Sequence, residues 1–277
     1  MTAIGHEGWF NLDLGTVKCP QVKFEFSLTE KVKDMSFQEA ADYSANLINV
    51  KYKNLHLCLS GGLDSEFVAD VFIRNNISFK PIIVLTPLNQ SEAWYAFRFC
   101  KINDLNPIIL DYRHHIDYNK LLKHILDISL KLRISPNVSL LPNLIARTIK
   151  DVELVTGHVD PFKIPKEYAD TISSIFEIER HDFHLELEYP EKHPGPFFLY
   201  TPEIFKSLIS EIDTSKNTQE AKSELYNIMT RSKIDTVLHQ AEIPTDLKYL
   251  LKDRVEKMRY TEVHLSISKE DLLNMFN

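Results

Sequence analysis

Residues 55–73 read Leu-His-Leu-Cys-Leu-Ser-Gly-Gly-Leu-Asp-Ser-Glu-Phe-Val-Ala-Asp-Val-Phe-Ile, and this stretch decides the fold class. Its first five residues form a mostly apolar run that is typical of a buried β-strand. A turn rich in serine and glycine follows at residues 60–65, and the pattern of an amphipathic helix continues from there. The stretch therefore predicts a strand, a tight turn and a helix in direct succession.

The turn Ser60-Gly61-Gly62-Leu63-Asp64-Ser65 has the composition of an anion-binding site. The N-terminus of the helix that follows presents unpaired backbone N–H groups and the positive end of the helix dipole. Gly61 and Gly62 let the backbone bend and approach an anion closely, and the two serines add hydroxyl donors. Asp64 is itself an anion, so we predict that it binds a Mg²⁺ ion that arrives with a nucleotide.

Strands and helices alternate along the chain on both sides of this turn. Strands are expected at residues 80–85, 107–111 and 152–156, and helices at 36–50, 89–103, 117–133 and 141–150. This alternation predicts parallel βαβ units, and the nearly continuous apolar strands predict a sheet that is covered on both faces. We therefore expect an α/β fold with a doubly wound, mainly parallel sheet. Ligands of such sheets bind beyond the carboxyl ends of the strands.

The segments before and after this core have different patterns. Residues 1–52 predict a β-containing lead-in and a helix that opens with the capping box Ser36-Phe37-Gln38-Glu39, and residues 22–28 alternate as an exposed strand would. Residues 53–161 form the predicted core. Residues 162–277 predict a mostly helical extension that determines the substrate. Within it we expect helices at 201–212, 217–232, 244–259 and after 268, and a strand at 263–267.

Composition restricts the class of protein. The 277 residues are 44% hydrophobic and 26% charged, as in a globular protein with a sizeable core. A net charge of −7 and a pI near 5.9 argue against a dominant nucleic-acid-binding face. The three cysteines are too widely spaced for a zinc site or a disulfide framework, which favours the reducing cytoplasm. No apolar run reaches transmembrane length, so no membrane contact is expected.

The turn meets every fixed position of the motif Ser-Gly-Gly-x-Asp-Ser and resembles the signature of the PP-loop ATP pyrophosphatases, the adenine nucleotide alpha-hydrolase-like superfamily. A Walker A loop is absent here, because the nearest downstream lysine is Lys80. The resemblance implies binding of ATP and Mg²⁺ and cleavage between the α and β phosphates to give AMP and pyrophosphate. The nucleotide contacts that it implies are Leu59, Ser60, Gly61, Gly62, Leu63, Asp64 and Ser65, with Leu85 and Thr86 next to the adenine.

Thr156-Gly157-His158-Val159-Asp160-Pro161 is the second informative segment, because it follows the fourth predicted strand. A glycine in that place permits close approach of a nucleotide. The segment resembles the asparagine-synthetase form Gly-x-Gly-x-Asp-Glu, which implies that Gly157 contacts the nucleotide and that Asp160 binds the metal. Val159 and Pro161 depart from that form. The alternative interpretation of Asp160 is a turn that starts at an Asp-Pro pair.

A pyrophosphate leaving group needs cations besides Mg²⁺, because charge builds on its oxygens in the transition state. The candidates are Lys163, Lys206, Lys222, Arg231 and Lys233. We favour Lys163, which lies near the crevice in the sequence, as the catalytic partner of Asp64. Glu92 is a further candidate metal or substrate ligand, although a glutamate in the first turn of a helix is also favoured by the helix dipole.

Missing cysteines narrow the branch of the family that the resemblance implies. Sulfonucleotide reductases need a C-terminal catalytic cysteine, whereas the last cysteine of this chain is Cys100. Thiolation enzymes usually use paired cysteines, which are absent, and glutamine-dependent asparagine synthetases need a nucleophilic cysteine where this chain has Thr2. We predict a standalone, asparagine-synthetase-like ligase that adenylates a small-molecule acceptor for attack by a nitrogen nucleophile. A homodimer or an ammonia-donating partner is compatible with this function. Two alternatives stay open: a PP-loop enzyme that modifies a nucleobase in tRNA or DNA, and a nucleotide-binding subunit without turnover.

Overall fold

The structure, a computed structural model, describes residues 2–13, 23–86, 89–113, 123, 127, 141–157, 175–178, 193–216, 218–228 and 265–276. Its centre is a five-stranded parallel sheet with the strand order β6-β5-β4-β7-β9. These strands are β4 (Leu55–Cys58), β5 (Lys80–Leu85), β6 (Ile108–Asp111), β7 (Glu153–Thr156) and β9 (Gly195–Pro196). The predicted α/β fold with a mainly parallel sheet is confirmed.

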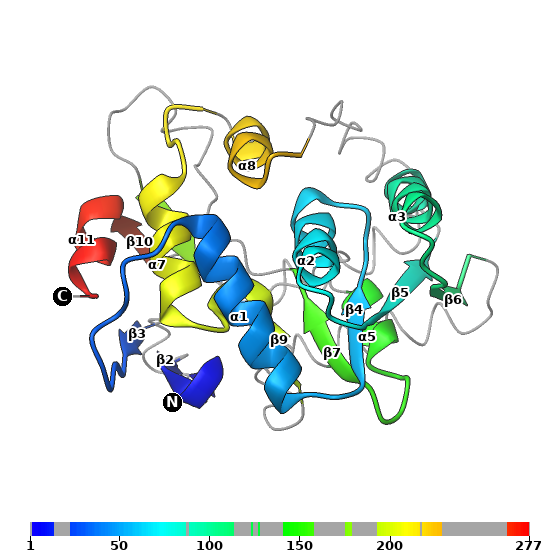
Figure 1. The fold of residues 1–277 in the computed structure, drawn as a ribbon, viewed down its shortest axis with the longest axis horizontal. Coiled ribbons are helices and arrows are strands. Elements are labelled where there is room, and N and C mark those ends of the chain that lie inside the picture. Colours follow the sequence, from blue (N-terminus) through cyan, green and yellow to red (C-terminus); the bar gives the residue numbers. More distant parts are fainter. Residues whose placement is uncertain are drawn as a thin grey trace.

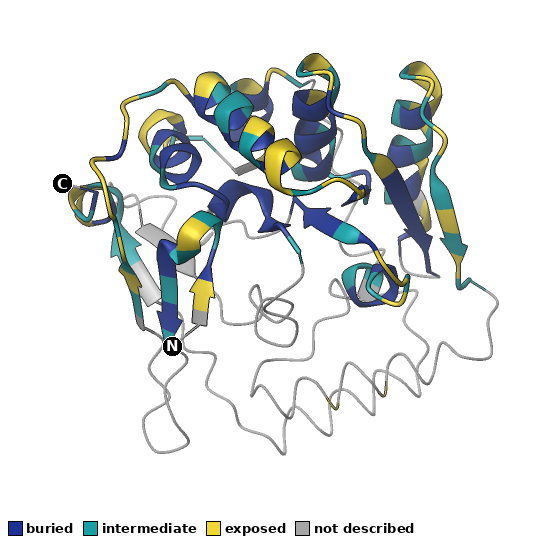
Figure 2. Ribbon diagram, turned by 60° about the horizontal axis from the view of Figure 1, so that its bottom comes forward, coloured by how far each residue is buried: buried dark blue, intermediate teal, exposed yellow. Residues whose placement is uncertain are grey.

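Helices cover both faces of this sheet (Figures 1 and 2). Helices α2 (Leu63–Arg74) and α3 (Gln90–Ile102) lie on one face, and α5 (Leu141–Ala146) lies on the other. Strand β4 is buried throughout because it has a neighbouring strand on each side and helices above and below. The edge strand β6 alternates between half-buried and exposed residues. The doubly wound arrangement that the sequence predicts is therefore present.

Helix α1 (Phe37–Lys51) connects the main sheet to a small antiparallel sheet at the N-terminus. The small sheet contains β1 (Thr2–Ile4), β2 (Phe10–Asp13) and β3 (Lys23–Phe26), so the strand predicted within residues 22–28 is present. The predicted capping box begins α1: the Ser36 hydroxyl accepts a hydrogen bond from the Glu39 amide, and the Glu39 carboxylate accepts one from the Ser36 amide at 2.9 Å. The 3₁₀ turn η1 (His6–Gly8) joins β1 to β2.

The C-terminal segment contributes both helices and strands. Strand β9 is the fifth strand of the main sheet, whereas β8 (Ile175–Ile178) and β10 (Leu265–Ser268) form a separate antiparallel pair. The helices are η5 (Phe197–Leu199), α7 (Pro202–Glu211), α8 (Thr218–Tyr226) and α11 (Lys269–Asn274). Helix α7 packs against α1, and one hydrophobic cluster of the described residues includes side chains from all three predicted segments.

Two predicted helices end earlier than the sequence pattern indicates. The helix predicted at residues 141–150 is α5 and ends at Ala146. The helix predicted at 217–232 is α8 and ends at Tyr226, because Asn227 adopts a left-handed φ of 56°. The helices predicted at 244–259 and, apart from residues 123 and 127, at 117–133 lie outside the described residues. No helix of the described part of the chain is long and apolar enough to cross a membrane.

Candidate functional site

The turn at residues 60–65 joins β4 to α2, as predicted, and its two serines shape it from within. Ser60 Oγ accepts a hydrogen bond from the Gly62 amide at 3.2 Å and lies 3.1 Å from Ser65 Oγ. Ser65 Oγ donates to the Gly62 carbonyl at 3.2 Å. Gly62 is the N-cap residue of α2 and makes no side-chain cap hydrogen bond to the N–H groups of the first turn. The start of α2 therefore has the form of an anion-binding site.

Gly61 is the residue of the turn that no side chain could replace. Its φ is 96°, and a Cβ atom there would lie 2.0 Å from the carbonyl oxygen of Glu92 in the first turn of α3. Gly62 has an ordinary extended backbone, and a Cβ atom there would lie 3.4 Å from Ser60 Oγ. The turn thus lies directly against the backbone of α3, and this packing requires a glycine at position 61.

Gly157 brings the end of β7 against the same turn. A Cβ atom at Gly157 would lie 2.8 Å from the amide nitrogen of Ser65 and 2.9 Å from the carbonyl carbon of Asp64. The structure therefore places Thr156 and Gly157, the two described residues of this segment, at the carboxyl edge of the sheet beside the start of α2, where the sequence predicts them. In the structure, position 157 requires a glycine because it packs against the first turn of α2. The contact of Gly157 with a nucleotide remains a prediction.

Asp64 lies in the first turn of α2 and contacts two side chains of α8, which lies beside α2 (Figure 1). Lys222 Nζ donates to Asp64 Oδ1 at 2.9 Å and to Oδ2 at 3.0 Å. The Tyr226 hydroxyl donates to Oδ1 at 2.7 Å. Lys222 and Tyr226 are four residues apart, so they share one face of the helix. Together these contacts form the Asp64–Lys222–Tyr226 cluster.

Burial strengthens the electrostatic attraction between Lys222 and Asp64. The Lys222 side chain is 3% exposed and the Asp64 side chain is 29% exposed. A lysine buried to this extent needs a nearby anion, because removing an ammonium group from water is costly. The Lys222 ammonium in turn balances the charge of Asp64. The partial positive charge at the start of α2 is then available to attract an anion.

Three aromatic rings hold the Tyr226 ring in place. Its ring stacks on Phe67 of α2 at a centroid distance of 4.5 Å and an interplanar angle of 22°. Phe37 of α1 and Phe198 of η5 lie 5.7 Å and 5.8 Å away and are nearly parallel to it. Because Tyr226 and these three rings come from four different elements, their packing fixes the direction of the Tyr226 hydroxyl. Tyr226 carried no signal in the sequence that would have marked it as part of the site.

Leu85 and Thr86, the predicted neighbours of an adenine, are buried at the carboxyl end of β5. Asn89 Oδ1 accepts hydrogen bonds from the Thr86 amide at 2.8 Å and from the Thr86 hydroxyl at 3.0 Å. Asn89 Nδ2 donates to the Val84 carbonyl at 2.8 Å, so this asparagine closes the loop between β5 and α3. Leu85 also lines a cavity of about 440 Å³ against Trp94 and other residues of α3 and β6. Contact of Leu85 and Thr86 with adenine remains a prediction.

The structure places two of the cations that we proposed from the sequence, Lys206 and Lys222, and they lie in different surroundings. Lys222, which the sequence ranked below Lys163, is the candidate that lies at Asp64 within the described part of the chain. Lys206 instead pairs with the exposed Asp34 at 2.6 Å. Lys163, Asp160, Arg231 and Lys233 lie outside the described residues, so their predicted roles remain predictions. The only signal for Lys222 in the sequence was its positive charge, because nothing in a local pattern shows that α8 packs on α2.

The donor set at Asp64 is compatible with a Mg²⁺ ion. Oδ1 accepts two hydrogen bonds, but Oδ2 accepts one and keeps a lone pair on a partly exposed carboxylate. Among the described residues, no group of three His, Cys, Asp or Glu side chains could hold a metal ion. A Mg²⁺ ion at Asp64 would therefore need phosphate oxygens and water as its other ligands, and this is how Mg²⁺ usually binds.

Several solved structures resemble this chain. No family model matches it, and no curated protein matches it significantly. Solved structures that it resembles include NH3-dependent NAD synthetase from Campylobacter jejuni (19% identity, TM-score 0.34, covering 80% of this chain and 94% of that chain). Another is NMN synthetase from Francisella tularensis, with 12% identity and a TM-score of 0.34, covering 82% of this chain and 97% of that chain. A third is a predicted subunit of tRNA methyltransferase from Methanocaldococcus jannaschii, with 13% identity and a TM-score of 0.33, covering 64% of this chain and 87% of that chain. Similarity at this level supports no conclusion about activity.

Proposed function

We propose that the chain binds ATP at residues 60–65 and cleaves it between the α and β phosphates to adenylate an acceptor. The observation that carries this proposal is the Asp64–Lys222–Tyr226 cluster at the start of α2. It combines an uncapped helix N-terminus, a carboxylate with a free lone pair and a buried ammonium group. A site that only had to hold a phosphate group would not need the carboxylate, which repels phosphate.

The groups of the turn and of the Asp64–Lys222–Tyr226 cluster have separate tasks in this reaction. The N–H groups at the start of α2 bind phosphate oxygens, and the hydroxyls of Ser60 and Ser65 join them by turning from the contacts that they make within the turn. We assign to the Lys222 ammonium, which lies 2.9 Å from Asp64 Oδ1, the task of binding the oxygens that gain charge as the α–β bond breaks. Tyr226 keeps its hydrogen bond to Asp64 and so preserves the orientation of the carboxylate. A bound Mg²⁺ ion would supply further neutralisation of the phosphate charge.

The acceptor is proposed from the sequence. We favour a small molecule that is adenylated and then attacked by a nitrogen nucleophile, as in an asparagine-synthetase-like ligase. Adenylation converts a poor leaving oxygen into AMP, so the protein only has to hold the two reactants in line. An enzyme that modifies a nucleobase in tRNA or DNA, and a nucleotide-binding subunit without turnover, are distinguished from this function by the experiment below.

The test is incubation with α-³²P-labelled ATP and Mg²⁺, with separate pools of amino acids, nucleobases and nucleic acids, followed by chromatography. We expect labelled AMP, together with unlabelled pyrophosphate, and we expect its formation to depend on one pool. Asp64→Asn and Lys222→Met should each abolish this turnover, whereas Lys216→Met should not, because Lys216 pairs with Asp213 and Glu224 at the surface. Formation of ADP alone would overturn the proposal. ATP binding without any turnover would identify a binding subunit instead.

A further inference from the structure

Helix α8 carries two members of the Asp64–Lys222–Tyr226 cluster but is short. It has nine residues, and an isolated helix of that length is marginal in water. Its position over α2 must therefore come from contacts outside the helix. The residues that make these contacts control where Lys222 and Tyr226 lie.

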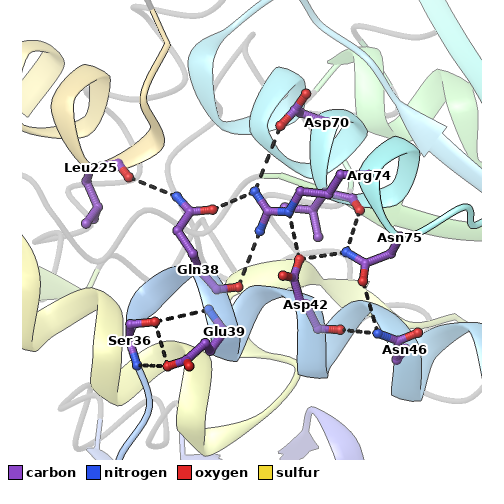
Figure 3. A network of polar contacts seen from close by, with 10 residues as sticks. Ser36, Gln38, Glu39, Asp42, Asn46, Asp70, Arg74, Asn75 and Leu225 are labelled. Carbon is purple, nitrogen blue, oxygen red and sulfur yellow. Dashed lines mark hydrogen bonds and ion pairs between the residues drawn. The ribbon is translucent and has the colours of Figure 1, made fainter.

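The C-terminal end of α8 has a carbonyl group that no backbone amide of the described residues satisfies. The Ile228 amide donates to the Ser223 carbonyl at 3.0 Å, and the Asn227 amide donates to the Glu224 carbonyl at 3.1 Å. These two bonds form a Schellman motif and leave the Leu225 carbonyl without an intrahelical partner. Gln38 of α1 supplies one, because its Nε2 donates to the Leu225 oxygen at 3.2 Å (Figure 3).

Arg74 of α2 determines which way the Gln38 amide points. Arg74 Nη1 donates to Gln38 Oε1 at 2.5 Å, and Nη2 donates to the Gln38 backbone carbonyl at 3.3 Å. A guanidinium group has no acceptor, so the amide oxygen must face Arg74 and the NH₂ group must face Leu225. The side chain of Gln38 is thus fixed at both ends.

The contacts of Arg74 hold its guanidinium in turn. Arg74 Nε donates to Asp42 Oδ1 at 2.7 Å, and Asp70 Oδ2 lies 3.9 Å from Nη1 (Figure 3). The guanidinium also lies over the face of Phe67, 5.8 Å from the ring centroid. Phe67 is the ring on which Tyr226 stacks. The polar contacts and the aromatic rings therefore meet at the same end of α8.

We propose that Gln38 is a positioning residue: its hydrogen bond to Leu225 holds α8 so that Lys222 and Tyr226 reach Asp64. Leu225 and Tyr226 are consecutive, and one is held by α1 through Gln38 while the other is held by α2 through Asp64. Loss of either contact removes one polar restraint on the end of the helix, while the stacking of Tyr226 on Phe37 and Phe67 remains. This inference rests on the proposed function for its effect on ATP, but the effect on α8 is independent of that function.

The variant Gln38→Glu isolates the contact. A glutamate keeps the oxygen that accepts from Arg74 and loses the donor to the Leu225 carbonyl. The matched control is Asn46→Ala, because Asn46 is an exposed residue of the same network. Its side-chain amide donates to the Asp42 carbonyl and to Asn75 Oδ1, and neither of these partners belongs to α8. Two quantities are measured for each variant: hydrogen exchange of residues 218–228, with α7 as the internal reference, and the affinity for Mg-ATP by calorimetry.

We expect Gln38→Glu to accelerate exchange in residues 218–228 about fivefold, which is the size of one hydrogen bond, and to weaken Mg-ATP binding by a similar factor. Exchange in α7 should not change, and Asn46→Ala should resemble the wild type in both measurements. Unchanged exchange in α8 would overturn the inference, and so would faster exchange with unaltered affinity. If the wild type binds no ATP, the proposed function fails, while the exchange measurement still decides whether Gln38 holds α8.

Discussion

Removing Lys222 tests the central feature of the site. The variant Lys222→Met keeps most of the apolar length of the side chain and removes its charge. Two unit charges about 3 Å apart attract by roughly 5 kcal/mol at an effective dielectric constant of about 20. The burial of Lys222 and the partial exposure of Asp64 both reduce the net value. We expect a loss of about 2 kcal/mol in the free energy of unfolding, between the typical values for exposed and buried pairs.

Removing the charge of the other partner, Asp64, should cost more of the free energy of unfolding, because Lys222 is more deeply buried than Asp64. Asp64→Asn leaves a lysine that is 3% exposed without its carboxylate, whereas Lys222→Met leaves an aspartate that is 29% exposed and can be hydrated. Loss of one partner from a buried pair typically costs about 3–5 kcal/mol, and we expect Asp64→Asn to approach that range. The double variant should recover part of the loss, with a coupling energy of about 2 kcal/mol.

Urea unfolding of the wild type, both single variants and the double variant measures these values, and calorimetry measures the affinity for Mg-ATP. Lys222→Met should weaken the affinity about 10- to 100-fold, because a charged hydrogen bond contributes about 1.5–3 kcal/mol. Lys216→Met is the control, since its ion pairs lie at the surface, and we expect a change below about 1 kcal/mol and an unaltered affinity. Additive losses in the double variant would refute the reasoning, and so would a Lys222→Met protein that binds ATP as the wild type does.

Two further predictions concern single positions. Gly61→Ala should destabilise the fold by more than about 3 kcal/mol, because residue 61 has a left-handed backbone conformation and its Cβ atom would lie 2.0 Å from the Glu92 carbonyl oxygen. Gly62→Ala should cost about 1 kcal/mol or less, because residue 62 has an ordinary extended backbone. Equal losses of the free energy of unfolding in urea would contradict this difference. Burial raises the pKa of the Cys58 thiol to about 12, so its contribution to stability is complete below the pKa of about 8.5 in the unfolded chain and is lost as the pH rises toward 12. The free energy of unfolding of the wild type relative to Cys58→Ala should therefore fall by about 2 kcal/mol between pH 7 and pH 10, and a difference that is independent of pH would show that the thiol is not buried.

Local patterns predicted the elements of the core well. The apolar run before Ser60, the glycine-rich turn and the helix after it are present as β4, the turn and α2, and the capping box at Ser36 begins α1. These features depend on interactions between residues a few positions apart. The end of α8 was predicted wrongly, because Asn227 stops the helix through a backbone conformation that the helical pattern of residues 217–232 does not reveal.

The candidate site likewise has one part that local sequence patterns predicted and one part that they did not. The amino-acid sequence by itself determined the turn, the uncapped start of α2 and the presence of Asp64, because a strand, a turn and a helix that follow one another need no distant contact to be recognised. Only the tertiary structure decided that Lys222 and Tyr226 complete the site, that Gln38 supports them and that Gly61 packs against α3. Each of these contacts joins residues far apart in the chain, and burial and stacking against α1 and α2 determine which face of α8 meets Asp64.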